Sequence, residues 1–171
     1  MQNLLDPELI TLATRVIDQN RKIGRRIAVA ESCTGGLVAA ALTEVAGSSD
    51  VFDCGFTTYS DGAKQNMLGV SGDLLQTFGA VSIAVAWEMA QGALERSGCD
   101  IAVAITGVAG PGGGSEKKPV GTVVFAKAEK GKSVEDVVAD RKNFGDDKSR
   151  AEIRFQAVLV ALELLLPEDE E

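Results

Sequence analysis

The sequence predicts an α/β domain in which helices pack in an α/β/α layered arrangement around a mixed sheet. Helical segments, with apolar residues three or four positions apart, alternate with short apolar runs through the first two thirds of the chain. Those runs are continuous, which is typical of strands covered by helices on both faces. Two strand-like segments then meet at Lys130-Gly131, which predicts a late hairpin and hence an antiparallel part of the sheet.

Local signals mark where the first elements begin and end. A helix is predicted over 5–23, because Asp6 is a good N-cap, Pro7 suits the first helical position, and Leu9 and Val16 lie on one apolar face. The elements that follow are a buried strand at 26–31, a helix at 35–46 closed by Gly47, and a strand at 51–59 rich in aromatic and β-branched residues.

The rest of the chain continues the alternation. We expect short helices at 61–68 and 71–78, a longer helix at 82–98 capped by Ser82, a strand at 100–106, a loop at 107–119, hairpin strands at 120–129 and 132–144, and a helix at 147–166. The acidic residues 167–171 are expected to be a disordered tail. No repeat or long linker divides the 171 residues, so we expect a single domain over 1–171.

Composition excludes several classes of protein. The net charge is -8 and no basic stripe interrupts it, so we expect no nucleic-acid partner. No apolar run is long enough to span a bilayer, and the first ten residues lack the pattern of a signal peptide, so we expect no membrane partner. Three cysteines without metal or redox spacing indicate free thiols, and the protein is expected to be cytoplasmic.

The chain contains no histidine. Its absence excludes Ser-His-Asp and Cys-His catalysis, zinc held by histidine, and histidine as a general acid or base. If the protein is an enzyme, its base must be a lysine, a carboxylate, a tyrosine or a bound water.

The first candidate site is the junction "ESCTGG" at 31–36, between a buried strand and a helix. In open α/β sheets ligands bind beyond the carboxyl ends of strands, and the free N–H groups of a helix N-terminus favour an anion. Ser32 is a candidate nucleophile, Cys33 is a rival, and Gly35 and Gly36 leave room for a ligand. Alternatively, Ser32 or Thr34 only caps the helix and the glycines ease packing.

The second junction holds a candidate base. A serine needs a base to become a nucleophile, and without histidine a lysine with a depressed pKa is the usual substitute. Lys64 follows the end of a strand by a few residues, and Tyr59 ends that strand, where it could relay a proton or hold the amine. Alternatively, they are a surface lysine and a tyrosine at the edge of the core.

The third junction is the Gly-rich loop that begins at Thr106, which could supply a hydroxyl and backbone donors to an anionic substrate. At the start of the last predicted helix Arg150 and Arg154 lie four residues apart, so both can point the same way toward a phosphate or carboxylate. Alternatively, the loop is a flexible connection and the arginines belong to a solvated face.

Several motifs in one order resemble the CinA C-terminal domain family, from about residue 5 to 166. They are "AESCTGG", "TYSDGAKQNMLGV", "AVSIAVAWEMAQGAL", "AITGVAGPGGGSEKKPVGTV" and "SRAEIRFQAVLVALELL". The resemblance implies an enzyme, a nicotinamide-nucleotide amidohydrolase that converts nicotinamide mononucleotide to nicotinate mononucleotide and ammonia. It also implies the stand-alone form, without the additional N-terminal domain that many family proteins carry.

The resemblance also assigns the site. Ser32 is the implied nucleophile, with Lys64 and Tyr59 as its activating partners. The implied substrate-binding residues are Cys33, Thr34, Gly35, Gly36, Thr106, Gly107, Gly110, Gly112 and Arg150. Family members often read Gly-Asp-Arg at the last helix, whereas this chain has extra residues before Arg150, which fits the family arginine by its spacing to Ile153 and Arg154.

The chemistry expected from the residues agrees with this assignment. Neutral Lys64, with Tyr59, takes the proton of Ser32, which attacks the carboxamide, while helix N-terminal N–H groups near Cys33 to Gly36 stabilise the oxyanion. No metal and no other cofactor is expected. Two alternatives stay open. The protein is a non-catalytic module that binds a nucleotide, or it is an amidase or phosphohydrolase that acts on another substrate. The apolar helices permit a homo-oligomer without locating its interface.

Overall fold

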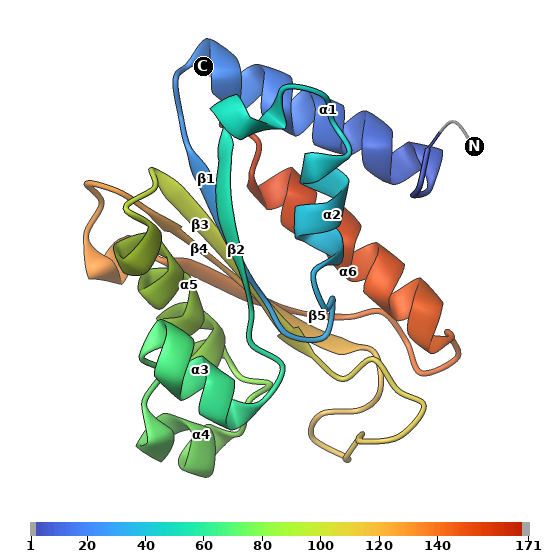
Figure 1. Cartoon of the computed structure of the whole chain (residues 1–171). Coiled ribbons are helices and arrows are strands. Elements are labelled where there is room, and N and C mark those ends of the chain that lie inside the picture. Colours follow the sequence, from blue (N-terminus) through green and yellow to red (C-terminus); the bar gives the residue numbers. More distant parts are fainter. Residues whose placement is uncertain (1–2, 169–171) are drawn as a thin grey trace.

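The computed structural model describes residues 3–168 and has the predicted α/β architecture (Figure 1). The strands are β1 (Ile27–Glu31), β2 (Phe52–Thr57), β3 (Ile101–Gly107), β4 (Thr122–Glu129) and β5 (Val138–Asn143). The helices are α1 (Pro7–Lys22), α2 (Leu37–Thr43), α3 (Asp61–Leu68), α4 (Gly72–Phe78), α5 (Ile83–Ser97) and α6 (Arg150–Leu164). Short 3-10 turns occupy Ser48–Asp50 and Val134–Asp136.

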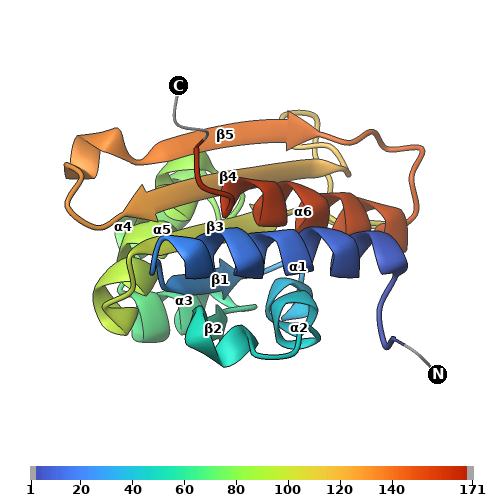
Figure 2. The same ribbon diagram turned by 90° about the horizontal axis from the view of Figure 1, so that it is seen from above.

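The five strands form one mixed sheet in the order β2-β1-β3-β4-β5. β1 pairs in parallel with both β2 and β3, whereas β4 pairs antiparallel with β3 and β5. Helices α1, α2 and α6 cover one face of the sheet, and α3, α4 and α5 lie on the other (Figures 1 and 2). The α/β/α layering and the mixed sheet predicted from the alternation of elements are therefore confirmed.

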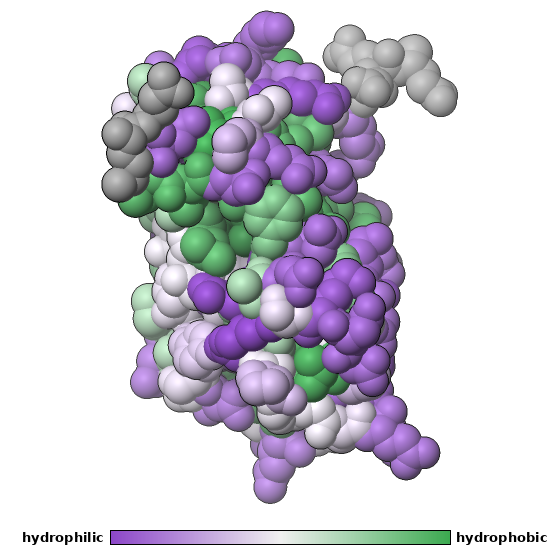
Figure 3. All heavy atoms as spheres, turned by 90° about the vertical axis from the view of Figure 1, so that its right-hand side faces the viewer, coloured by the Kyte–Doolittle hydropathy of each residue, from purple (hydrophilic) through white to green (hydrophobic). Residues whose placement is uncertain are grey.

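Burial explains why the central strands read as continuous apolar runs. Every residue of β1 is buried, and only the last residue of β3 is partly exposed, because helices cover both faces. The edge strands β2 and β5 are much more exposed. Partly buried residues such as Leu12, Leu37 and Phe155 pack against the core. One side of the molecule shows apolar side chains between polar ones (Figure 3).

Several boundaries differ from the predicted ones for local reasons. The second hairpin strand begins at Val138 instead of residue 132, because Ser133 and Asp136 form a capping box that closes a 3-10 turn before it. The last helix begins at Arg150 instead of 147, because Ser149 is its N-cap and forms a capping box with Glu152. The helix expected over 35–46 spans only Leu37–Thr43.

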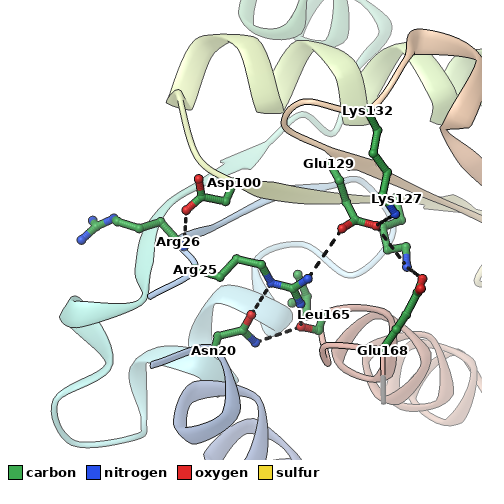
Figure 4. Close-up of polar contacts among 9 residues, drawn as sticks. All are labelled: Asn20, Arg25, Arg26, Asp100, Lys127, Glu129, Lys132, Leu165 and Glu168. Atoms are coloured by element: carbon green, nitrogen blue, oxygen red, sulfur yellow. Dashed lines mark hydrogen bonds and ion pairs between the residues drawn. The ribbon is translucent and has the colours of Figure 1, made fainter. Parts of the chain in front are cut away.

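A polar network joins α1, α6 and the sheet where β1 begins (Figure 4). Asn20 and Arg25 both donate to the carbonyl of Leu165, at 2.9 and 2.8 Å, and so satisfy a backbone acceptor at the end of α6. Arg25 also lies 3.7 Å from Glu129, whose carboxylate contacts Lys132 at 2.9 Å. These contacts join the end of α6 to the segment that leads into β1 and to the end of β4.

Two further findings bear on the expected class of protein. Within residues 3–168, no helix is both long enough and apolar enough to cross a membrane. Of the predicted disordered tail at 167–171, Pro167 and Glu168 follow α6 without regular structure, and the last three residues lie outside the described part of the chain.

Candidate active site

The candidate residues meet at one edge of the sheet because β1, β2 and β3 are adjacent and parallel. Ser32 follows β1, Lys64 lies in the helix after β2, and Thr106 is near the end of β3. Together these segments border a cavity of about 190 Å³. Its lining consists of Ser32, Cys33, Tyr59, Asp61, Lys64, Ala80, Val81, Thr106, Gly107, Ala109 and Arg150.

Ser32 and Lys64 are in direct contact, although 32 positions separate them in the chain. The Nζ atom of Lys64 lies 3.0 Å from Oγ of Ser32 and 2.9 Å from the carbonyl oxygen of Thr58. Lys64 is only 1% exposed and Ser32 is 8% exposed. The pair therefore has the distance and the shielding from water that proton transfer from a serine to an amine requires.

Burial determines which protonation state of Lys64 is favoured. Loss of hydration lowers the pKa of Lys64 below its ordinary value, and the nearby Asp61 and Cys33 offset part of that effect. Among the described residues, no carboxylate lies within ion-pair distance of Nζ. A neutral amine has a free lone pair, so this environment favours the form of Lys64 that can act as a base.

The turn that carries Ser32 is held by the residue before it. The carboxylate of Glu31, which is 1% exposed, accepts hydrogen bonds from the backbone N–H groups of Val38 at 2.9 Å and Ala39 at 3.1 Å. Glu31 thus caps α2 from the end of β1. Gly36 is the N-cap residue itself, with φ +96, a conformation that L side chains rarely adopt.

This capping narrows the oxyanion donors expected near Cys33 to Gly36. Two of the first N–H groups of α2 are bound by Glu31, and Leu37 donates to the carbonyl of Thr34. In the described part of the chain, the backbone N–H groups of Cys33, Thr34 and Gly36 donate to no other residue. The available donors therefore lie in the turn before the helix, immediately after Ser32, and not in the helix.

We expect Glu31→Gln to lower the free energy of unfolding by about 1–3 kcal/mol. The amide replaces one accepting oxygen by a donor that faces a backbone N–H, so one of the two bonds to Val38 and Ala39 is lost. Urea unfolding followed by circular dichroism measures the change. Glu152→Gln is the matched control, because that capping glutamate is exposed and its replacement should cost less. Equal losses in the two variants would contradict this role of Glu31.

Tyr59 lies at the mouth of the cavity, not on the serine. Its side chain is 62% exposed, and its hydroxyl accepts a hydrogen bond of 2.9 Å from Arg150, which also donates to the carbonyl of Gly110 at 2.7 Å. Within residues 3–168, no hydrogen bond joins Tyr59 to Ser32 or Lys64. The predicted participation of Tyr59 in the proton relay thus stays a prediction, and the geometry pairs it with Arg150.

The remaining predicted binding residues are placed differently. Thr106 and Gly107 line the cavity, but the Thr106 hydroxyl donates to the carbonyl of Ala80 at 2.9 Å. A Cβ on Gly107 would lie 2.9 Å from Val123 and 3.1 Å from the sulfur of Cys33, so only glycine fits there. The residues outside the cavity lining are Thr34, Gly35, Gly36, Gly110 and Gly112.

Cys33 is a poor rival for Ser32. Burial raises the pKa of its thiol to about 11, and the Glu31 carboxylate adds to this, against smaller lowering effects from its own backbone N–H, Arg154 and Lys64. The thiol is therefore protonated at neutral pH, and it is unreactive in that form because the thiolate is the nucleophile.

Among the described residues, no group of three or more His, Cys, Asp or Glu side chains could hold a metal ion.

Sequence reasoning did not predict two features of the site. One is what Arg154 contacts: it reaches the turn after Ser32 from α6 and donates to the carbonyl oxygens of Cys33 at 3.1 Å and Thr34 at 3.2 Å. The other is the apolar wall at Ala80 and Val81, between α4 and α5. The four-residue spacing from Arg150 signalled Arg154 as a candidate, but not which atoms it would contact.

Comparison with known proteins decides the family. Residues 9–168 match the CinA C-terminal domain. The chain belongs to that family. It is 49% identical over 142 residues to the nicotinamide-nucleotide amidohydrolase PncC of Enterobacter agglomerans, which is 83% of this chain and 84% of that protein. It is 46% identical over 163 residues to the PncC of Escherichia coli K12, which is 95% of each.

A solved structure agrees with the sequence matches. The competence/damage inducible protein CihA from Agrobacterium tumefaciens superposes with a TM-score of 0.89 at 49% identity, covering 95% of this chain and 96% of that one. Other members of the CinA family are much longer. A CinA-like protein of Akkermansia muciniphila is 51% identical over 128 residues, which is 75% of this chain but 31% of that protein.

Proposed function

We propose that this CinA C-terminal domain is a nicotinamide-nucleotide amidohydrolase, which hydrolyses the carboxamide of nicotinamide mononucleotide to nicotinate mononucleotide and ammonia. The observation that carries the proposal is the buried contact between Ser32 and Lys64 at the end of β1. Relatives that bear this name match 83% to 95% of the chain. An acyl transfer needs a nucleophile, a base and oxyanion donors, and residues of each kind lie together here.

The proposed reaction proceeds through a covalent acyl-enzyme. The neutral amine of Lys64 takes the proton of the Ser32 hydroxyl, and Oγ bonds to the carboxamide carbon. The negative oxygen of the tetrahedral intermediate faces the N–H of Cys33, which lines the cavity, and the next N–H along the turn, that of Thr34, whose residue is outside that lining. Such a contact is worth roughly 3 kcal/mol per donor. The ammonium of Lys64 then protonates the leaving nitrogen as the C–N bond breaks and ammonia departs.

Hydrolysis of the acyl-enzyme repeats the same steps with water. Lys64 accepts a proton from the attacking water, the carbon–Oγ bond breaks, and the proton returns to Ser32. The products are the free hydroxyl of Ser32 and the carboxylic acid, which ionises at neutral pH. Each step uses only groups of this chain and water, so the proposed mechanism requires no metal or other cofactor.

Arg150 supplies a positive charge for the phosphate of a nucleotide. It also borders a second cavity of about 590 Å³, whose charged lining residues are Arg150, Lys148, Glu116 and Asp146. In the described part of the chain Arg150 has only neutral oxygen partners, the Tyr59 hydroxyl and the Gly110 carbonyl. We propose that the pyridine ring enters the smaller cavity and the ribose phosphate lies toward the larger one.

The proposed activity also indicates where the enzyme acts and what it binds. We infer that it acts in the cytoplasm, with a small-molecule nucleotide and no nucleic acid as its partner. The net charge of -8 supports the last point. A homo-oligomer is compatible with the exposed apolar side chains, among them Phe78 and Ile83.

We expect the purified protein to release ammonia from nicotinamide mononucleotide and much less from nicotinamide riboside, which lacks the phosphate. Arg150→Met should raise KM for the mononucleotide about 10- to 100-fold, because a charge-assisted contact is lost, and should change turnover of the riboside little. A coupled assay of ammonia measures both. Binding of the mononucleotide without ammonia release at any pH from 6 to 10 would replace the proposal by a non-catalytic binding module.

A further inference from the structure

The turn after Ser32 contains a chain of polarised peptide groups that begins at Arg154. The Nη2 atom of Arg154 donates to the carbonyl of Thr34 at 3.2 Å. The N–H at the other end of that peptide group belongs to Gly35, and it donates to the carbonyl of Ser32 at 3.0 Å. The N–H of the next peptide group belongs to Cys33. It donates to no other described residue, and Cys33 lines the cavity.

A second, shorter chain starts at the same guanidinium. Nε of Arg154 donates to the carbonyl of Cys33 at 3.1 Å, and the N–H of that peptide group belongs to Thr34, which also has no acceptor within the described residues. In a trans peptide the C=O and N–H point in opposite directions. The N–H of Thr34 is therefore the far end of one peptide group whose carbonyl faces Arg154. The N–H of Cys33 is the far end of two such groups in series.

The charge of the guanidinium matters for these N–H groups. A guanidinium carries a permanent positive charge, and hydrogen bonds linked in series polarise one another in a site shielded from water. A cation at the carbonyl end draws electron density from the N–H end, which makes that N–H a stronger donor. Arg154 is partly buried, and among residues 3–168 no carboxylate lies within ion-pair distance to neutralise it.

We propose that Arg154 is a positioning residue that holds and polarises the peptide groups of the turn, so that the N–H groups of Cys33 and Thr34 bind the oxyanion of the tetrahedral intermediate. The inference rests on the proposed function and adds a role to it. Arg154 contacts carbonyl groups and reaches no substrate atom, so it acts through the backbone. We expect Arg154 to stabilise the transition state more than the bound substrate, because the carboxamide oxygen gains its negative charge only as the serine attacks.

The test compares Arg154→Met, which keeps the length of the side chain and removes the charge, with Arg154→Lys, which keeps the charge. Steady-state ammonia release from nicotinamide mononucleotide gives kcat and KM. We expect Arg154→Met to lower kcat about 10- to 100-fold with KM almost unchanged, and Arg154→Lys to recover part of kcat. Arg15→Met, at an exposed arginine of α1, is the matched control and should behave as wild type.

A second readout does not depend on the natural substrate. A fluorophosphonate reacts with an activated serine: the Oγ–P bond forms, fluoride leaves, the serine proton passes to Lys64, and the phosphonyl oxygen occupies the oxyanion position. We expect Arg154→Met to slow this labelling of Ser32 by a factor similar to its loss of kcat, and Arg154→Lys to slow it less. If Arg154→Met does not fold by circular dichroism, Arg154→Lys alone should still show lower kcat and slower labelling.

The outcomes separate the two proposals. A wild-type protein that is labelled but releases no ammonia would overturn the proposed function, while the labelling rates of the variants still decide the role of Arg154. Wild-type kcat and labelling in Arg154→Met would overturn the role of Arg154. A raised KM with unchanged kcat, or a lysine variant no better than the methionine one, would overturn it too. Failure of the wild-type protein to be labelled would remove the activated Ser32 on which this inference depends.

Discussion

Ser32→Ala should abolish ammonia release from nicotinamide mononucleotide, with a loss of roughly 10⁴-fold or more in kcat. The variant lacks the oxygen that forms the acyl-enzyme, and no other described hydroxyl lies within hydrogen-bond distance of Nζ of Lys64. Because Ser32 is almost buried and the change removes one atom, we expect the fold to persist, with a nearly unchanged circular dichroism spectrum.

Cys33→Ala is the matched variant for this experiment. It deletes the neighbouring sulfur from the same turn, and we expect it to keep most of its activity, since the pKa of this thiol is raised to about 11. A reversal, in which Cys33→Ala is inactive and Ser32→Ala retains full activity, would assign the nucleophile to the thiol. Trapping a labelled acyl group on either residue, followed by mass spectrometry, identifies the nucleophile independently.

Lys64→Met should lower kcat by roughly 10³-fold, the scale of a lost general base. Methionine has a similar length and no basic nitrogen, so the Oγ of Ser32 would lose its proton acceptor and the carbonyl of Thr58 its donor. Lys64→Arg is the informative partner, because it keeps a positive charge but cannot act as a base at neutral pH. An arginine variant with wild-type kcat would show that Lys64 supplies charge only.

The pH dependence of the wild-type enzyme follows from the same lysine. Catalysis needs the neutral amine, so kcat should rise with pH through the depressed pKa of Lys64 and level off above it. The folded protein also binds fewer protons at Lys64 than the unfolded chain does between that pKa and the ordinary value of 10.5, so this group makes stability increase with pH in that window. Lys64→Met should lose that contribution, which urea unfolding at several pH values can measure.

The order and type of the elements followed from local signals alone. Continuous apolar runs predicted buried strands, proline and serine caps marked where helices begin, and the structure confirms the layered arrangement and the mixed sheet. Boundaries were less accurate where side chains compete for backbone groups. The capping box at Ser133 and Asp136 replaced part of a predicted strand, because those side chains satisfy nearby N–H groups without strand pairing.

The candidate site was predicted in part. In a chain without histidine, a lysine with a depressed pKa is the usual base for a serine, and this indicates Ser32 and Lys64 from the sequence. The structure places these two side chains in contact, but it places Tyr59 on Arg150, at the exposed mouth of the cavity. A hydrogen-bond partner that lies 91 positions away in the chain has no local sequence signal.

The sequence by itself determined the order and type of the main helices and strands, the family resemblance and the chemical types available at the ends of the strands. Only the tertiary structure decided which groups of the turn after Ser32 are occupied and which are free. Glu31 takes the first N–H groups of α2, and Arg154 takes two carbonyls of the turn from another helix. The physical reason is that periodicity and capping act over a few residues, whereas burial and backbone polarisation depend on elements packed together from distant parts of the chain.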